Sequence, residues 1–152
     1  MDTSIKRHES LKQLSREHHY GLLLCWKIRN GFKKSVEPVR IQLYTNWFFE
    51  NYLQPHFKEE EELIFPILGN EHKLVKKALS EHRRLQRLFN EKVDIHKSLS
   101  LIEEELERHI RFEERILFNE LQNVISKEQA DMITSTHDAQ NINDNWHDKF
   151  WE

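Results

Sequence analysis

The chain has 152 residues with 23 basic and 26 acidic side chains, which leave a net charge of −3 at pH 7. The two signs are interleaved, so no basic face indicates nucleic-acid binding, and no apolar run reaches the ~18 residues of a membrane-spanning helix. The N-terminus has no apolar signal core, and the single cysteine, Cys25, excludes an internal disulfide, so we expect a cytoplasmic protein. Only three Gly and three Pro occur, which favours an all-α fold, and the length fits one domain over residues 1–152.

Four long helices are predicted from capping residues and breakers. Their ranges are Ser4 or His8 to Asn30, Pro38 to about Phe65, about Asn70 to Ile95, and Ser100 to about Val124. Gly31 is a typical C-terminal stop for the first helix, and Pro38 suits the first turn of the second. Asn70 can cap the third, and Ser100-x-x-Glu103 is a capping box for the fourth.

The last part of the chain predicts a short helix and a docked tail. Ser126-x-x-Gln129 is a second capping box, opening a helix that reaches about Thr136. The tail, residues 141–152, is polar but carries three aromatic side chains, which we expect to dock onto the body: Trp146, Phe150 and Trp151. Because short connections make neighbouring helices antiparallel, the pattern predicts an up-down-up-down four-helix bundle over about residues 8–125, with 126–152 as an extension.

Two segments share one motif that combines histidine and glutamate. His56 precedes Glu60 by four residues, and His109 precedes Glu113 by the same step. Four residues bring two side chains onto one face of a helix, so imidazole and carboxylate can bind one metal ion together. At each place a second glutamate and an apolar run ending in phenylalanine come next in the chain.

The positions of these pairs, more than their spacing, indicate metal binding. His-x-x-x-Glu is common by chance in a chain with ten histidines, and exposed pairs of this kind are usually solvated neighbours. Here the pairs lie on apolar stripes, at Phe49, Tyr52, Leu53, His56, Glu60, Leu63 and Ile67, and at Ile102, Leu106, His109, Glu113, Leu117 and Val124. A buried unpaired glutamate is costly, so these stripes predict a cation in the core.

The other two helices each place one histidine at the centre of an apolar stripe. The stripes are Leu11, Leu14, His18, Leu22, Cys25, Ile28 and Phe32, and Leu74, Ala78, His82, Leu85, Phe89 and Val93. A lone histidine on such a stripe is usually an ordinary core residue, but four helices with the same arrangement are hard to explain by packing. His19 is expected to face solvent, as are Glu61 and Glu62.

The donor set indicates the metal. The predicted ligands are His18, His56, Glu60, His82, His109 and Glu113. Imidazoles and carboxylates without a thiolate suit iron, manganese or zinc, and six donors exceed the four of a structural zinc site, so two ions are expected. Ferritin-like centres use Glu-x-x-His instead. Counted from the turn between neighbouring helices, the candidate ligands lie at similar heights. The exception is the first pair of helices, where the ligands of the second helix lie about eight residues farther from the turn than His18 does.

These motifs over about residues 8–125 resemble the hemerythrin-like cation-binding domain. The resemblance implies a four-helix bundle with a non-haem centre of two iron ions, oxo- or hydroxo-bridged, for which zinc or manganese could substitute. The family includes oxygen carriers, oxygen or iron sensors, and proteins that respond to nitric oxide or repair iron–sulfur clusters. The expected function is therefore binding or sensing of oxygen, nitric oxide, peroxide or a related small ligand, and the protein partner is unknown.

One position departs from the oxygen carriers of this family. They have a fifth histidine one turn before the position of His82, where this chain has Ala78. Water, a bridging Glu60 or Glu113, or a displaced Glu59 or Glu81 could supply the missing donor, or the position could stay open to small ligands. A ferroxidase- or peroxidase-like enzyme or an iron-handling protein is the alternative, although Tyr52 is the one unassigned proton donor on the inner stripes. A third possible function is that of a helical interaction module that binds no metal.

Overall fold

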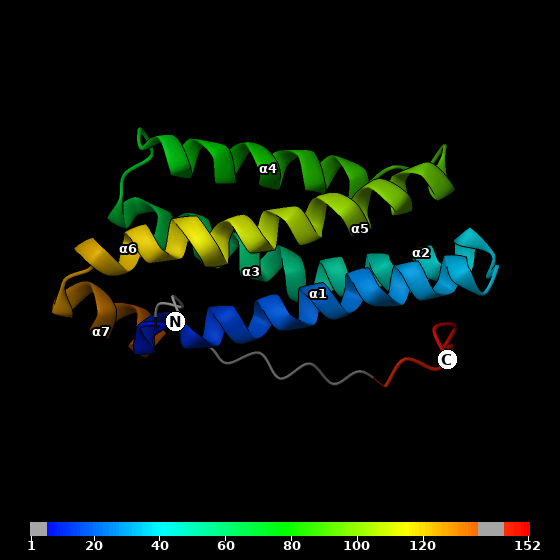
Figure 1. Cartoon of the computed structure of the whole chain (residues 1–152), viewed down its shortest axis with the longest axis horizontal. Helices are drawn as coiled ribbons and strands as arrows, with labels where there is room; N and C mark the ends of the chain where they lie inside the picture. The colour runs from blue at the N-terminus through cyan, green and yellow to red at the C-terminus, as the bar shows by residue number, and fades with distance from the viewer. Residues whose placement is uncertain (1–5, 137–144) are drawn as a thin grey trace, which may run out of the picture.

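The computed structural model describes residues 6–136 and 145–152, and within these ranges the chain forms helices and no strand (Figure 1). Four helical stretches lie side by side along the long axis. The first is η1 (Glu9–Leu11) with α1 (Lys12–Lys33), and the second runs through α2 (Pro38–Phe48), η2 (Phe49–Leu53), α3 (Gln54–Glu59), η3 (Glu60–Ile64) and η4 (Phe65–Ile67). The third is α4 (Lys73–Phe89), and the fourth is α5 (Ile95–Phe112), η5 (Glu113–Leu117) and α6 (Phe118–Val124). The short α7 (Lys127–Thr136) comes after them.

Helix α1 passes through Gly31 instead of ending there, so the predicted stop was wrong. A Cβ atom on Gly31 would lie 2.7 Å from Ile41 Cδ1 and 3.0 Å from Phe150 Cδ2. The glycine therefore allows α2 and the C-terminal tail to pack closely against α1. The helix ends two residues later, and Ser35, with φ of 58°, makes the turn.

Two helix starts differ from the predicted ones. His72, not Asn70, caps α4, since its Nδ1 accepts a hydrogen bond from the backbone N–H of Leu74. Asp94 caps α5 through the backbone N–H of Lys97, so the helix begins before the predicted Ser100 box. In both cases a side chain of the preceding loop accepts the hydrogen bond that caps the helix. The Ser126 box is confirmed by reciprocal hydrogen bonds between Ser126 and Gln129.

The expected surplus between the first two helices disappears in the structure. Gly31 and Ile41 mark the level at which α1 and α2 touch. His18 lies thirteen residues before Gly31 and His56 fifteen residues after Ile41. The π-helical turn η2 takes up one residue of this small difference. The two histidines therefore lie at similar heights, although α2 begins at Pro38.

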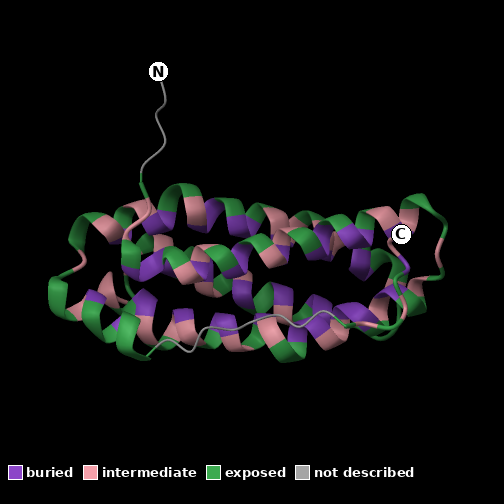
Figure 2. Ribbon diagram, turned by 90° about the horizontal axis from the view of Figure 1, so that it is seen from below, coloured by how far each residue is buried: buried purple, intermediate pink, exposed green. Residues whose placement is uncertain are grey.

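Two apolar clusters flank the buried histidines and glutamates. One cluster gathers side chains of α1, α2, α4 and α5 toward the loop after Lys33, and it includes Ile28, Ile41 and Leu99. The other packs η1, η3, η4, α4 and α6 around Phe65 and Phe118. Figure 2 shows buried residues facing inward along all the long helices. The polar residues between the clusters are thus enclosed by apolar side chains.

The described part of the tail docks onto the body, as predicted; residues 141–144 of the predicted tail lie outside the described residues. Phe150 is 3% exposed within the first apolar cluster. Asn30 Nδ2 donates to the backbone oxygen of Trp151 at 2.6 Å, and the Arg40 guanidinium pairs with Asp148. Lys27 is buried beneath the Trp151 ring, with its Nζ 3.9 Å from the ring centroid. The tail is held by apolar, hydrogen-bonding and cation–π contacts together.

Among the described residues, no helix combines the length and the apolar character needed to cross a membrane.

Candidate metal centre

The fold brings all six predicted ligands into one buried cluster, where each is at most 3% exposed: His18, His56, Glu60, His82, His109 and Glu113. They come from all four helical stretches. His18 lies on α1 and His82 on α4, and each remaining stretch supplies a histidine and a glutamate. Both glutamates are fully buried. His19 is exposed, so α1 has the predicted phase at this point.

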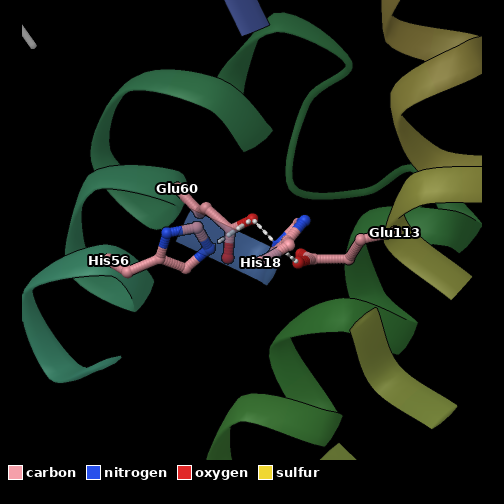
Figure 3. Close-up of side chains that lie close together, drawn as sticks. All are labelled: His18, His56, Glu60 and Glu113. Carbon is pink, nitrogen blue, oxygen red and sulfur yellow. Dashed lines mark hydrogen bonds and ion pairs between the residues drawn. The ribbon is translucent and has the colours of Figure 1, made fainter. Parts of the chain in front are cut away.

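His18, His56, Glu60 and Glu113 form the first of two donor groups (Figure 3). The four side chains point toward one another, and their donor atoms all lie within 4.8 Å of each other. His18 Nε2 is 2.9 Å from Glu113 Oε1 and 3.6 Å from Glu60 Oε2. Neighbouring donors around an ion with bonds of about 2.1 Å lie ~3 Å apart, so this spacing suits a transition metal.

The second donor group contains His82 and His109 and shares both glutamates with the first. His82 Nε2 is 3.2 Å from Glu60 Oε1, while the other oxygen of Glu60 faces His56 Nε2 at 3.4 Å. Glu113 Oε1 lies 2.9 Å from His18 of the first group and 3.3 Å from His109 of the second, and its Oε2 lies 3.9 Å from His82. Each carboxylate thus faces both groups, as a ligand bridging two ions would.

The buried donors fit a cation because several of them have no hydrogen-bond partner. Within the described residues, six buried atoms that face the centre make no hydrogen bond: both Glu60 oxygens, Glu113 Oε2 and the Nε2 atoms of His56, His82 and His109. Burying such atoms unpaired costs free energy. A metal ion held between them would satisfy all of them at once.

Without a metal, the histidines and glutamates of the centre hold each other in charged forms. Burial alone lowers the pKa of His56, but the charge of Glu60 and the hydrogen bond to Glu17 outweigh it and raise this pKa to about 9. The pKa of His109 rises to about 9 in the same way, with burial opposed by Glu113. Burial favours the neutral form of Glu60, yet His56 and the other imidazoles hold its pKa well below the usual range. A metal ion must therefore displace protons from the imidazoles.

The stability of the metal-free protein should depend on pH through these histidines. Because His56 and His109 have a pKa near 6.5 when unfolded and about 9 when folded, their contribution is complete below pH 6.5. It is lost as the pH rises through about 9. Metal affinity should change in the opposite direction, rising toward about pH 9 as fewer protons are displaced. Thermal unfolding of metal-free protein measures the stability, and chelator competition measures the metal affinity, each between about pH 6 and about pH 9. Equal metal affinity at about pH 7 and about pH 9 would contradict the role of these histidines as metal ligands.

Four further glutamates contact the outer ring nitrogens of the histidines, and their role was not predicted. Glu61, expected in solvent, accepts from His82 Nδ1 at 2.7 Å. Glu81, considered as a replacement ligand, instead accepts from His109 Nδ1 at 2.7 Å. Glu17 accepts from His56 Nδ1 at 2.7 Å, and Glu114 lies 3.6 Å from His18 Nδ1. The sequence signal was present, since each of these glutamates is adjacent to a predicted ligand.

A small cavity of about 10 Å³ borders the first donor group, which is room for about one water molecule. It is lined by Glu17, His18, Gly21, Phe48, Tyr52, Leu53, His56 and Ile110. Its exposed lining is almost entirely apolar. Ala78, where the oxygen carriers have their fifth histidine, is instead fully buried within the second apolar cluster. A small apolar space thus adjoins the His18 side of the centre.

Replacing His18 by Ala should remove metal. His19→Ala should leave the metal content unchanged and the free energy of unfolding within about 0.5 kcal/mol of the parent. His18 is 3% exposed and contacts both shared glutamates, while His19 is exposed. Metal analysis and thermal unfolding of the two variants make the comparison. Metal loss in His19→Ala with retention in His18→Ala would mean that α1 is rotated by about 100° from the structure.

Comparison with protein families gives one match. The model of the hemerythrin HHE cation binding domain matches residues 9–94, more than half of the chain. This span contains four of the six predicted ligands, and the fold adds His109 and Glu113 from beyond it. Neither the search of curated proteins nor the search of solved structures gave a match.

Proposed function

The chain belongs to the hemerythrin HHE cation-binding family, and we propose that it binds two iron ions and through them binds or senses oxygen, nitric oxide or a related small ligand. The observation that carries the proposal is the pair of donor groups, each with two histidines, that share Glu60 and Glu113. Two imidazoles with carboxylate oxygens suit iron, with zinc or manganese as possible substitutes. When bound, a ferrous pair would supply the electrons that favour binding of a diatomic ligand.

The proposal includes the up-down-up-down four-helix bundle and a single domain over residues 1–152. The four helical stretches that lie side by side support this architecture, because each contributes to the same buried centre (Figure 1). We also place the protein in the cytoplasm, without nucleic-acid or membrane partners. The single cysteine, Cys25, cannot form a disulfide within the chain, which fits a reducing compartment. Its thiol is fully buried, and burial raises its pKa to about 12.

A small ligand would reach the centre through the cavity beside His18 and His56. The apolar walls suit a diatomic molecule, and the cavity ends at the imidazoles of the first donor group. Gly21 borders this space, and a Cβ there would already lie 2.7 Å from Ile110 Cδ1. A larger side chain at this position would therefore compete with a ligand for the same volume.

The proposal is tested with iron-loaded, reduced protein, azide or nitric oxide as the probe, and the absorption spectrum as the readout. The parent should respond to the probe. Gly21→Val should keep its iron but bind azide about tenfold more weakly or worse, because the added side chain would fill the small cavity. No spectral response in iron-loaded parent protein would refute ligand binding.

Ala78→His serves as the matched substitution on the opposite side of the centre. It would place an imidazole one turn from His82, where it could act as a fifth histidine donor for the second donor group. We expect this variant to bind iron more tightly and to keep its azide response. Loss of the response in Ala78→His, with Gly21→Val unaffected, would instead place the open position beside Ala78.

A di-iron enzyme of ferroxidase or peroxidase type is the second candidate, because Tyr52, which carries a hydroxyl group, lines the cavity together with His18 and His56. A proton donor in this place is what oxygen activation requires. Iron oxidation or peroxide turnover that falls in Tyr52→Phe at unchanged iron content would favour the enzyme. Binding without turnover favours the ligand-binding protein.

A further inference from the structure

The outer face of the centre carries a repeated contact between a glutamate and a ligand histidine. The histidines keep Nε2 toward the shared carboxylates, while Nδ1 faces a second carboxylate. This second contact is a hydrogen bond for His56, His82 and His109, whereas His18 Nδ1 lies farther from its carboxylate and makes no hydrogen bond. The four pairs are Glu17 with His56, Glu61 with His82, Glu81 with His109, and Glu114 with His18. Three of these contacts measure 2.7 Å and the fourth 3.6 Å.

The four glutamate–histidine pairs connect neighbouring helical stretches in the same way. Each glutamate is the chain neighbour of a ligand on its own helical stretch but contacts the histidine of the next stretch. Glu17 of α1 reaches the second stretch, Glu61 of η3 reaches α4, and Glu81 of α4 reaches α5. Glu114 of η5 returns to α1, so the four contacts close into a ring.

We propose that these four side chains, Glu17, Glu61, Glu81 and Glu114, are positioning residues that hold each histidine with Nε2 directed at the metal ions. The inference rests on the proposed metal-binding function and assigns it four residues beyond the ligands. An ionised carboxylate only accepts hydrogen bonds, so contact at Nδ1 fixes the proton there and leaves the Nε2 lone pair for the cation. Carboxylates placed in this way orient ligand imidazoles and increase their basicity.

Burial separates these contacts from ordinary surface pairs. Every histidine of the ring is at most 3% exposed, while the glutamate side chains range from 6% exposed for Glu17 to 37% for Glu61. An exposed pair at similar distance would contribute little. Here the imidazole cannot turn to solvent for another partner, so the glutamate decides its orientation.

Two cationic side chains lie beside the outer glutamates. Arg7 lies beside Glu114, with NH2 3.4 Å from Oε2, and Lys77 pairs with Glu81. These two side chains place positive charge beside two of the four outer glutamates.

The test replaces each ring glutamate by Gln, which has nearly the same shape but no charge. Metal affinity is measured by chelator competition with Zn²⁺ and with Fe²⁺. We expect a loss of about 10- to 100-fold in Glu17→Gln, Glu61→Gln and Glu81→Gln. The loss should be smallest in Glu114→Gln, whose contact is the longest. Glu62→Gln is the control, because Glu62 is exposed and neighbours Glu61 in the chain.

Side-chain ¹⁵N spectra of the histidines distinguish positioning from a general loss of stability. Zn²⁺ is diamagnetic, so the Nδ1 and Nε2 signals of loaded protein can be observed. Glu17→Gln should shift the His56 signals, and Glu81→Gln those of His109, while the other ligand histidines stay close to the parent. Metal affinities within about twofold of the parent, or shifts spread equally over all four histidines, would overturn the proposal.

These outcomes are separable from failure of the proposed function. If the parent binds Zn²⁺ at this centre but shows no response of its iron form to azide or nitric oxide, ligand sensing fails and the ring is still tested by Zn²⁺. If the parent binds neither metal, the spectra of metal-free protein decide: unchanged His56 signals in Glu17→Gln overturn the ring. A shift confined to His56 supports it.

Discussion

Replacing Glu60 by Gln should remove both metal ions from the protein. Glu60 is fully buried, and its two oxygens face different donor groups, Oε2 toward His56 and Oε1 toward His82. An amide is a weaker ligand and cannot provide two anionic oxygens. The metal-free variant should also be less stable by about 3–5 kcal/mol at neutral pH, because the raised pKa values of the surrounding histidines depend on the charge of Glu60.

Metal analysis and denaturant unfolding of Glu60→Gln measure these two effects. Glu62→Gln is the control, since the same change two residues later alters an exposed side chain. The control should retain both ions and its stability. A Glu60→Gln protein that keeps one ion at parental affinity would show that the two groups do not share this carboxylate.

Replacing His82 by Ala should remove at least one metal equivalent and lower thermal stability. His82 is 1% exposed, stacks on Phe57 with ring centroids 3.9 Å apart, and faces both shared glutamates. Its loss leaves a cavity and reduces the positive charge beside two buried carboxylates, for a cost of about 3 kcal/mol. The first donor group keeps all its members, so we expect one remaining ion of lower affinity.

The comparison for His82→Ala is His19→Ala, which removes an exposed imidazole. Iron content per chain and the unfolding temperature are measured for both. Unchanged metal content in His82→Ala would exclude His82 as a ligand.

The sequence was sufficient to predict which six side chains meet in the core because their environment is unusual. Histidine and glutamate at a four-residue step within an apolar stripe have no ordinary explanation, and the structure brings all six residues together. The family match agrees with this interpretation. The all-helical class could be predicted from composition and capping, and the tail docked because three aromatic side chains in a polar segment need an apolar contact.

The phase of the helices beyond the centre was not predictable from a regular period. Glu60 and Glu113 each begin a π-helical turn, which inserts one residue and rotates the next part of the helix about its axis. Ile64 and Phe65 are therefore buried where Leu63 and Ile67 were expected. Val124 is 51% exposed for the same reason. A period of 3.6 residues cannot indicate where a π turn occurs.

The outer glutamates were missed because neighbouring residues on a helix point about 100° apart. That rule places Glu61 away from the face of Glu60, and therefore toward solvent. In the structure the same rotation directs Glu61 to the adjacent helix, where His82 Nδ1 lies at the edge of the core. Whether such a side chain meets water or a neighbouring helix depends on packing, which one sequence does not specify.

The most direct test of the central claim is the number of iron ions per chain in protein loaded anaerobically with Fe²⁺ and then freed of excess metal. Two donor groups that share Glu60 and Glu113 predict two ions per chain, both lost in Glu60→Gln. One ion or none in the folded parent protein, at a pH near 9 where the imidazoles release their protons most easily, would contradict the account.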